Sequence, residues 1–162
     1  ADACGFSDEA LIRGLFTAAG IGLVIAENAS ISGAFGGCQA ECGSAAAVAA
    51  AAVVEMAGGT PAQSAEALAL AMKNLLGLAC DPVAGLVEVP CVKRNAFGAV
   101  HALLAAEMAL AGITSVIPAD EVIDAMHQIG LSMPRALKET SEGGLAKTPT
   151  AIKLTEKILG GK

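Results

Sequence analysis

The chain has 162 residues, of which 54% are hydrophobic and 16% charged, and its formal net charge is -6 at pH 7. This length suits a single domain with its own core. Trp and Tyr are absent, so Ala, Leu, Val and Ile must form most of that core. The net negative charge argues against nucleic acid as a partner, because nucleic-acid binding depends on clustered Lys and Arg.

Neither membrane insertion nor export is expected. A bilayer span needs about 18 uninterrupted apolar residues, and the apolar run 11–26 is interrupted by Arg13. No secretory signal is visible at the start of the sequence. Five cysteines, an odd number, in a chain without an export signal argue against a disulfide framework. We therefore expect a cytoplasmic protein whose thiols serve as ligands or catalytic groups.

The first half of the sequence predicts two helices separated by a loop. Ser7 is a good N-cap for a helix that continues to about Glu27. The segment 28–37 is rich in turn formers, which predicts an irregular loop whose backbone can approach a ligand closely. Residues 41–57 are almost entirely Ala and Val, a pattern typical of a central helix that is buried on all sides.

The second half predicts further helices and one ordered loop. The segment 60–63, Thr-Pro-Ala-Gln, is a capping box for a helix with one apolar stripe. Pro82 and Pro90 favour a loop between Cys80 and Cys91. No strand pair or repeat stands out, so the sequence predicts an all-α fold, a compact multi-helix domain over 1–162 with a buried Ala-rich central helix and cysteine-bearing loops. The remaining expected helices are marked by Phe97, Val100, Leu104 and Met108, by Val122, Ile123, Met126 and Ile129, and by Ile152, Leu154, Ile158 and Leu159.

Four cysteines fall in or beside the irregular segments. Soft thiolates select iron-sulfur clusters, zinc or copper(I), and the spacing Cys38-x41-Cys80-x10-Cys91 does not match a paired Cys-x2-Cys zinc site. Lys93 and Arg94 add two cations beside Cys91, which favours an anionic thiolate there. The pattern indicates a metal site drawn from three loops, although thiols that are merely packed in a core remain the alternative. On three thiolates, a cubane cluster keeps one iron open to substrate as a Lewis acid.

Several motifs resemble the α chain of iron-sulfur-dependent L-serine dehydratases, in order and spacing, over about residues 15–150. They are Glu27-Asn-Ala-Ser-Ile-Ser-Gly-Ala34, Gly37-Cys-Gln-Ala-Glu41, Gly77-Leu-Ala-Cys-Asp-Pro-Val-Ala-Gly85, Val89-Pro-Cys91, Arg94-Asn-Ala96, Pro118-Ala-Asp-Glu-Val-Ile123 and Glu139-Thr-Ser-Glu-Gly-Gly-Leu-Ala146.

The resemblance implies the cofactor and the reaction. Cys38, Cys80 and Cys91 correspond to the three cysteines that hold a [4Fe-4S] cluster, whereas Cys4 and Cys42 are given no role. The implied reaction converts L-serine to pyruvate and ammonia, in amino-acid degradation and gluconeogenesis, without pyridoxal phosphate. The open iron accepts the serine hydroxyl while a base, which no residue here is assigned to be, removes the α-proton.

The resemblance also implies partners. A Thr-Asn-Gly-type loop and a β domain or β chain of the family are missing, so we expect a fragment of an α subunit, its C-terminal cluster-binding part, that needs a β chain within an oligomer. No cysteine follows Ile158, which is typical of the two-chain branch.

Six residues are candidates for contacts to the substrate or to the groups around the cluster, because hydroxyls, amides and Arg can hold carboxylates or cluster sulfur. His101 and His127 are given no role. Three alternatives remain open: a structural metal module such as a zinc site, a helical partner-docking domain without metal, and a dehydratase for another hydroxy acid or amino acid. The six candidates are Asn28, Ser30, Ser32, Lys93, Arg94 and Asn95.

Overall fold

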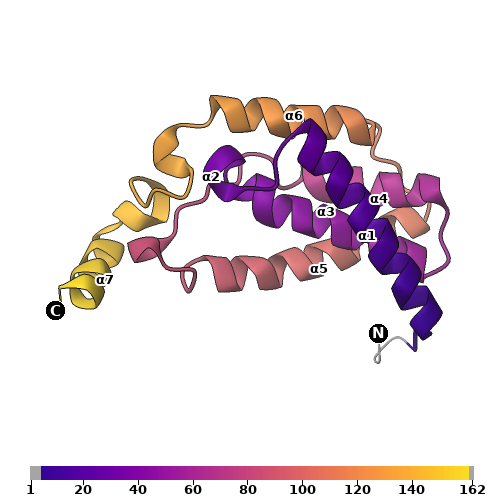
Figure 1. Cartoon of the computed structure of the whole chain (residues 1–162), viewed down its shortest axis with the longest axis horizontal. Helices are drawn as coiled ribbons and strands as arrows, with labels where there is room; N and C mark the ends of the chain where they lie inside the picture. The colour runs from indigo at the N-terminus through magenta and orange to yellow at the C-terminus, as the bar shows by residue number, and fades with distance from the viewer. Residues whose placement is uncertain (1–4, 161–162) are drawn as a thin grey trace.

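The computed structural model describes residues 5–160, and over this range the fold is all-α, as expected (Figure 1). One isolated parallel β-bridge joins Cys80 to Lys138. A π-helical turn spans Gln39–Gly43, and 3-10 turns span Val83–Gly85, Arg135–Leu137 and Gly144–Lys147. The α-helices are α1 (Asp8–Asn28), α2 (Gly33–Gly36), α3 (Ser44–Met56), α4 (Pro61–Lys73), α5 (Cys91–Leu110), α6 (Ala119–Ser132) and α7 (Pro149–Leu159).

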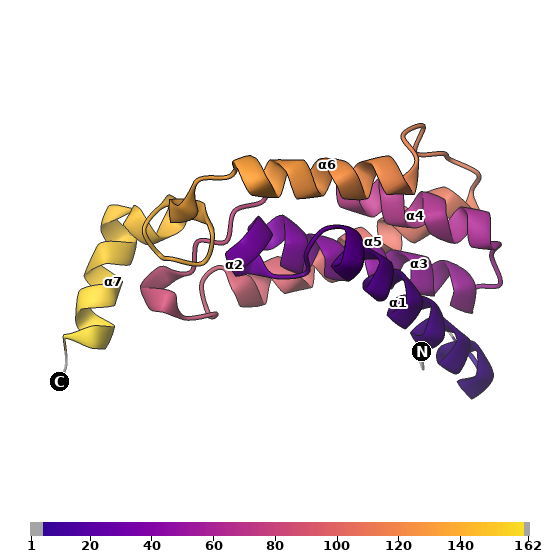
Figure 2. The ribbon, with the colours of Figure 1, turned by 45° about the horizontal axis from the view of Figure 1, so that its top comes forward.

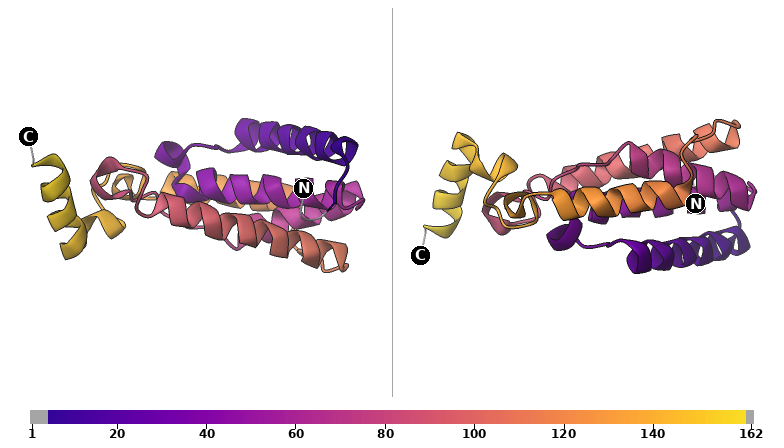
Figure 3. Two further views of the ribbon diagram at one scale, coloured as in Figure 1. Left: turned by 90° about the horizontal axis from the view of Figure 1, so that it is seen from below. Right: turned by 90° about the horizontal axis from the view of Figure 1, so that it is seen from above.

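Helix α3 is the centre of the bundle. It contacts α1, α4 and α5, and α1 and α5 lie on opposite sides of it (Figure 3). Helix α6 packs on α4 and runs along one side of the bundle (Figure 2). Ala47, Ala50 and Ala51 are fully buried in α3. Their burial confirms the predicted Ala-rich central helix. Small side chains let the neighbouring helices approach closely.

Both predicted N-caps are present. The Ser7 hydroxyl accepts a hydrogen bond from the Ala10 amide at 3.2 Å. Thr60 and Gln63 form a reciprocal capping box, in which the Thr60 hydroxyl accepts from the Gln63 amide at 3.2 Å and the Gln63 side chain accepts from the Thr60 amide at 2.9 Å. These caps satisfy backbone donors that the first helical turn leaves unpaired, so they fix where α1 and α4 begin.

Helix α1 is long and apolar enough to cross a membrane by length and composition, although a core helix or a signal sequence meets the same test. Only 17% of its most apolar 18-residue window is buried. Gly14 and Ile25 face the bundle, whereas Leu15, Phe16 and Leu23 are exposed. Burial within this chain therefore accounts for one face of α1 alone.

Two expectations need correction, and the packing of α5 is a further finding. The segment 28–37 is not loop throughout, because residues 33–36 form α2. The central helix is preceded by a π-helical turn, Gln39–Gly43, which carries Cys42 and directly follows Cys38. The large apolar residues of α5 do not fill the core. Phe97, Val100 and Leu104 are exposed, and the buried face of α5 is made of alanines.

The C-terminal part lies at one end of the bundle. Helix α7 packs against the 3-10 turn 83–85 rather than against α3 (Figure 1). To reach it, the chain from Pro134 to Thr148 passes over the loop that begins at Cys80. This segment therefore contributes to the surroundings of the cysteines.

Candidate functional site

Four cysteines from three separate segments gather at one end of α3; we call them the thiol site. Cys38, Cys42 and Cys80 are buried in contact with one another, Cys91 is half-buried at the start of α5, and all four thiols are free. In the described residues, no three His, Cys, Asp or Glu side chains are arranged to hold a single metal ion. The four thiols thus share one site at the end of α3.

Gln39 fixes the Cys38 segment. Its side chain is buried, its amide nitrogen donates to the Met126 carbonyl at 2.9 Å, and its amide oxygen accepts from the Gly77 backbone at 2.9 Å. Its backbone amide donates to the Leu78 carbonyl at 2.9 Å. Because buried amides need their partners, Gln39 ties the segment to α6 and to the chain leaving α4. Sequence reasoning gave Gln39 no role.

The Cys80 loop is held from both sides by the C-terminal segment. The Cys80 amide donates to the Leu137 carbonyl at 2.9 Å, and the Glu139 amide donates to the Cys80 carbonyl at 2.7 Å. The Asp81 carboxylate accepts from the Leu145 amide at 2.8 Å. A Cβ at Gly144 would lie 2.4 Å from the same carboxylate, so only glycine fits there.

Arg94 joins the Cys80 loop to the first turn of α5. Its guanidinium donates to the Ala79 carbonyl at 2.7 Å and to the Asp81 carboxylate at 3.2 Å. The two side chains are 17% and 7% exposed, so this ion pair is largely buried. The structure therefore gives the predicted candidate Arg94 two protein acceptors beside Cys80.

Cys42, Cys80 and Cys91 carry raised pKa values. Burial, followed by the effects of Cys38 and of the Glu41 charge, raises the pKa of Cys42 to about 12, and burial with the charges of Cys38 and Glu41 does the same for Cys80. Burial also raises the pKa of Cys91, while Arg94 lowers it. Burial alone would lower the pKa of the Arg94 guanidinium, but its interactions with Cys38 and Asp81 raise it. Without a metal, Cys42 and Cys80 are therefore protonated at neutral pH.

Glu41 is a member of this site that sequence reasoning missed. The position of a Cβ on Gly33 lies 2.7 Å from the Glu41 carboxylate and 3.0 Å from the Cys80 sulfur. The carboxylate therefore reaches across Gly33 toward Cys80, and its charge raises the pKa of three thiols. The only sequence signal was that Glu41 ends the motif that starts at Gly37.

The other predicted candidates divide between two places. Asn95 accepts a hydrogen bond from the Cys42 thiol at 3.2 Å, so it lies at the thiol site. Asn28 donates to the Val24 carbonyl within α1 and lines a hollow shared with α6. Ser30 accepts from the Ser32 backbone at 3.1 Å. Ser32 directly precedes Gly33, which borders the thiol site, and Cys4 lies outside the described residues.

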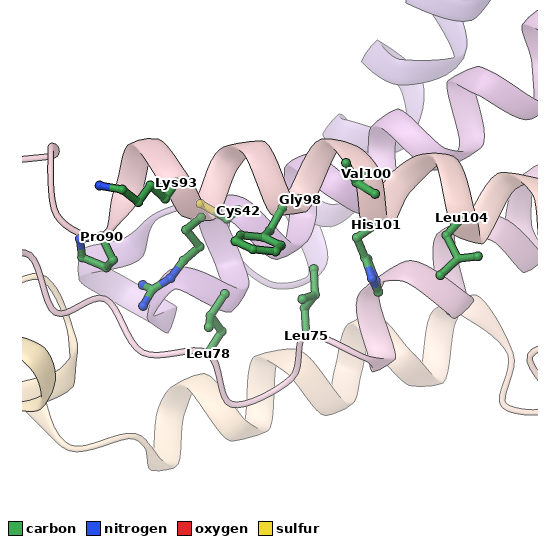
Figure 4. Close-up of a pocket in the computed structure, with 11 residues that line it drawn as sticks. Cys42, Leu75, Leu78, Pro90, Lys93, Gly98, Val100, His101 and Leu104 are labelled. Atoms are coloured by element: carbon green, nitrogen blue, oxygen red, sulfur yellow. The ribbon is translucent and has the colours of Figure 1, made fainter.

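A groove of about 550 Å³ adjoins the thiol site between α5 and the chain that follows α4 (Figure 4). Cys42 lines it, with Leu75 and Leu78 opposite α5 and the exposed Lys93 at the Pro90 end. His101 also lines the groove, and its Nε2 lies 2.9 Å from the Ala71 carbonyl. That contact occupies one ring nitrogen of His101.

The donor set fits an iron-sulfur cluster: several buried sulfurs, one buried cation and an apolar rim. This helical scaffold with its thiol site belongs to a known class of protein. Residues 1–146 match the family model described as serine dehydratase alpha chain, so the chain belongs to that family.

Three similar proteins give the match its detail. The chain is 71% identical over 153 residues to the "Probable L-serine dehydratase, alpha chain" of Bacillus subtilis (strain 168), covering 94% of this chain and 51% of that protein. It is 64% identical over 152 residues to the protein of the same name from Latilactobacillus sakei, covering 94% and 73%. It is 51% identical over 154 residues to the "L-serine dehydratase, alpha chain" of Peptoniphilus asaccharolyticus, covering 95% and 53%. The chain thus spans about half the length of two of them.

Proposed function

We propose that this chain holds a [4Fe-4S] cluster on Cys38, Cys80 and Cys91 and is the cluster-bearing part of an iron-sulfur-dependent L-serine dehydratase. The observation that carries the proposal is that these three free thiols, far apart in sequence, gather at one site beside the buried Arg94. Family membership and the names of the similar proteins support L-serine as the substrate.

The arrangement of the thiols favours a cluster over a single ion. In a [4Fe-4S] cluster each cysteine binds a different iron, so the ligands stand further apart than the ligands of one tetrahedral zinc ion. The gathering of four free thiols at one site and the family membership of the chain support the cluster. When bound, a cluster on three thiolates supplies an iron that acts as a Lewis acid on the serine hydroxyl.

The residues of the chain prepare the site for this chemistry. Burial of Cys38 and Cys80 keeps bulk water away from two of the ligands. The backbone bonds of Cys80 and the side chain of Gln39 hold the ligand segments in place. Elimination of water from L-serine gives 2-aminoacrylate, which tautomerises to the imine and takes up water again to release ammonia and leave pyruvate. No pyridoxal phosphate takes part in this proposal. Asn95, Lys93 and Ser32 remain candidates for contacts at the rim.

Further protein is proposed to cover the exposed apolar surface. Leu15 and Phe16 on α1, and Phe97 and Val100 on α5, are each more than half exposed. Apolar side chains that gather on a surface mark interfaces. The chain covers only 51% of the Bacillus subtilis relative. We therefore extend the proposal to the rest of an α subunit and a β chain, assembled in a cytoplasmic oligomer.

The test is an anaerobic assay of pyruvate formation from L-serine by the complete enzyme that contains this chain, loaded with iron and sulfide. The proposal predicts that Cys80→Ser abolishes turnover, that Cys42→Ser keeps most of it, and that hydroxylamine, which traps pyridoxal phosphate, leaves it unchanged. Equal turnover in wild type and Cys80→Ser, or loss of turnover with hydroxylamine, would contradict the proposal.

A further inference from the structure

Arg94 contacts the backbone and the side chain on either side of Cys80. Its guanidinium donates to the carbonyl of Ala79, which precedes Cys80, at 2.7 Å, and to the carboxylate of Asp81, which follows it, at 3.2 Å. Arg94 itself lies three residues after Cys91, in the first turn of α5. One side chain therefore fixes the Cys80 segment to the Cys91 segment.

The orientation of the Arg94 side chain is fixed by its two acceptors. Asp81 is in turn fixed by the Leu145 amide at 2.8 Å, so the direction of the guanidinium is set by two anchored acceptors. A planar guanidinium with fixed acceptors is held in one orientation. The ammonium group of a Lys side chain would not be held in this way, because it lacks the planar fork of donors.

We infer that Arg94 is a positioning residue, which aligns the Cys80 and Cys91 segments and keeps one positive charge beside the cluster, and that it does not bind the substrate carboxylate. The inference rests on the proposed function only for the identity of the cluster. Two of its donor groups already have protein acceptors, and its side chain is only 17% exposed. An approaching carboxylate would have to displace Ala79 or Asp81.

Lys93 provides the matched comparison. It is the neighbouring cation, it is exposed, and it lines the groove. In the part of the chain that the structure describes, it takes part in none of the ion pairs or side-chain hydrogen bonds found. A substrate carboxylate can therefore reach Lys93 without breaking a contact within the protein.

The experiment compares wild type, Arg94→Gln, Arg94→Lys and Lys93→Gln after anaerobic loading with iron and sulfide. It measures iron retention against a chelator, the reduction potential of the cluster, and KM for L-serine in the complete enzyme. Arg94→Gln is expected to weaken iron retention by about 10- to 100-fold, the usual effect of losing a residue that orients metal ligands. It should also lower the potential, because a reduced cluster gains negative charge without a nearby cation. KM for L-serine in the loaded fraction should stay within about 2-fold of wild type, because Arg94 makes no contact with the substrate in this account and its loss removes no binding interaction.

Two further variants separate charge from geometry. Arg94→Lys should restore the potential but not the iron retention, because it keeps the charge and loses the planar fork. Lys93→Gln should retain iron like wild type. If Arg94→Gln does not fold, Asp81→Asn is measured instead and should shift iron retention in the same direction.

The outcomes distinguish this inference from the proposed function. Wild-type iron retention and potential in Arg94→Gln, with a large rise in KM, would overturn the inference and make Arg94 the carboxylate-binding residue. A wild-type chain that takes up no iron would overturn the proposed function itself.

Discussion

The Asp81 carboxylate lies 3.2 Å from the Arg94 guanidinium in a largely buried ion pair, and it also accepts the Leu145 amide at 2.8 Å. Asp81→Ala leaves a buried cation and a buried amide without their acceptor. Breaking a buried pair from one side costs about 3–5 kcal/mol. We expect a loss of this size in the free energy of unfolding, measured by urea denaturation of the metal-free chain. Glu142→Gln is the control, because the Arg135–Glu142 pair is exposed at 3.8 Å and contributes at most about 1 kcal/mol. Equal losses in the two variants would contradict this account.

Gly33 borders both Glu41 and Cys80. A Cβ there would lie 2.7 Å from the Glu41 carboxylate and 3.0 Å from the Cys80 sulfur. Gly33→Ala should therefore displace one of these groups and reduce iron uptake under reconstitution, measured as iron per chain. Gly20→Ala is the control, since nothing lies within 4 Å of its Cβ position in α1. It should leave iron uptake unchanged and stabilise the helix by about 0.5–1 kcal/mol. Full iron uptake by Gly33→Ala would show that the site has more room than described.

The Glu41 carboxylate opposes thiolate formation. Burial is the main reason why the pKa of Cys80 is about 12, and the charges of Cys38 and Glu41 add to it. Glu41→Gln removes one negative charge, so the pKa values of Cys42, Cys80 and Cys91 should fall while staying above their ordinary value. Alkylation by iodoacetamide, followed by mass spectrometry between pH 7 and pH 9, should then be faster at these cysteines. Glu121→Gln, at the exposed start of α6, is the control. An unchanged alkylation profile would place the Glu41 charge away from the thiols.

The metal-free chain should lose stability at alkaline pH. In the folded protein Cys42 and Cys80 have pKa values of about 12, raised from 9.0. Above pH 9 the unfolded chain therefore binds fewer protons than the folded one, and the free energy of unfolding falls with rising pH. The stabilisation is complete below pH 9 and is lost toward pH 12, at a slope of at most roughly 1.4 kcal/mol per pH unit for each thiol. The chain has no Tyr that would titrate in this range.

Urea midpoints at pH 8, 9 and 10, with a chelator and a reductant present, measure this dependence. The double variant Cys42→Ala, Cys80→Ala should show a much flatter dependence. A stability of the wild type that rises between pH 9 and pH 10 would contradict the raised thiol pKa values.

The sequence was sufficient for features set by local chemistry. The caps at Ser7 and Thr60 were predicted because a side chain three residues from its amide partner needs no tertiary contact. The buried helix α3 was predicted because a segment apolar on all sides can only lie inside. The family resemblance singled out Cys38, Cys80 and Cys91 before their surroundings were known, and their role as ligands stays a prediction.

The rest depends on contacts between distant segments. No local signal places Leu145 on Asp81, 64 residues away, or the Gln39 side chain on Met126, 87 residues away. The stripe of Phe97, Val100 and Leu104 has the period of a core face, but it is exposed because alanines on the opposite side of α5 pack against α3 and α4. Hydrophobic periodicity gives the helix and not the partner that covers it.

The central claim is that Cys38, Cys80 and Cys91 together hold the cluster. The most direct measurement is anaerobic reconstitution of the chain with iron and sulfide, with iron and sulfide per chain and the visible charge-transfer band recorded for wild type and for Cys38→Ala, Cys42→Ala, Cys80→Ala and Cys91→Ala. The account predicts one four-iron cluster in wild type and in Cys42→Ala, and loss of the cluster in each of the other three variants. No cluster in wild type, or equal retention in all four variants, would contradict it.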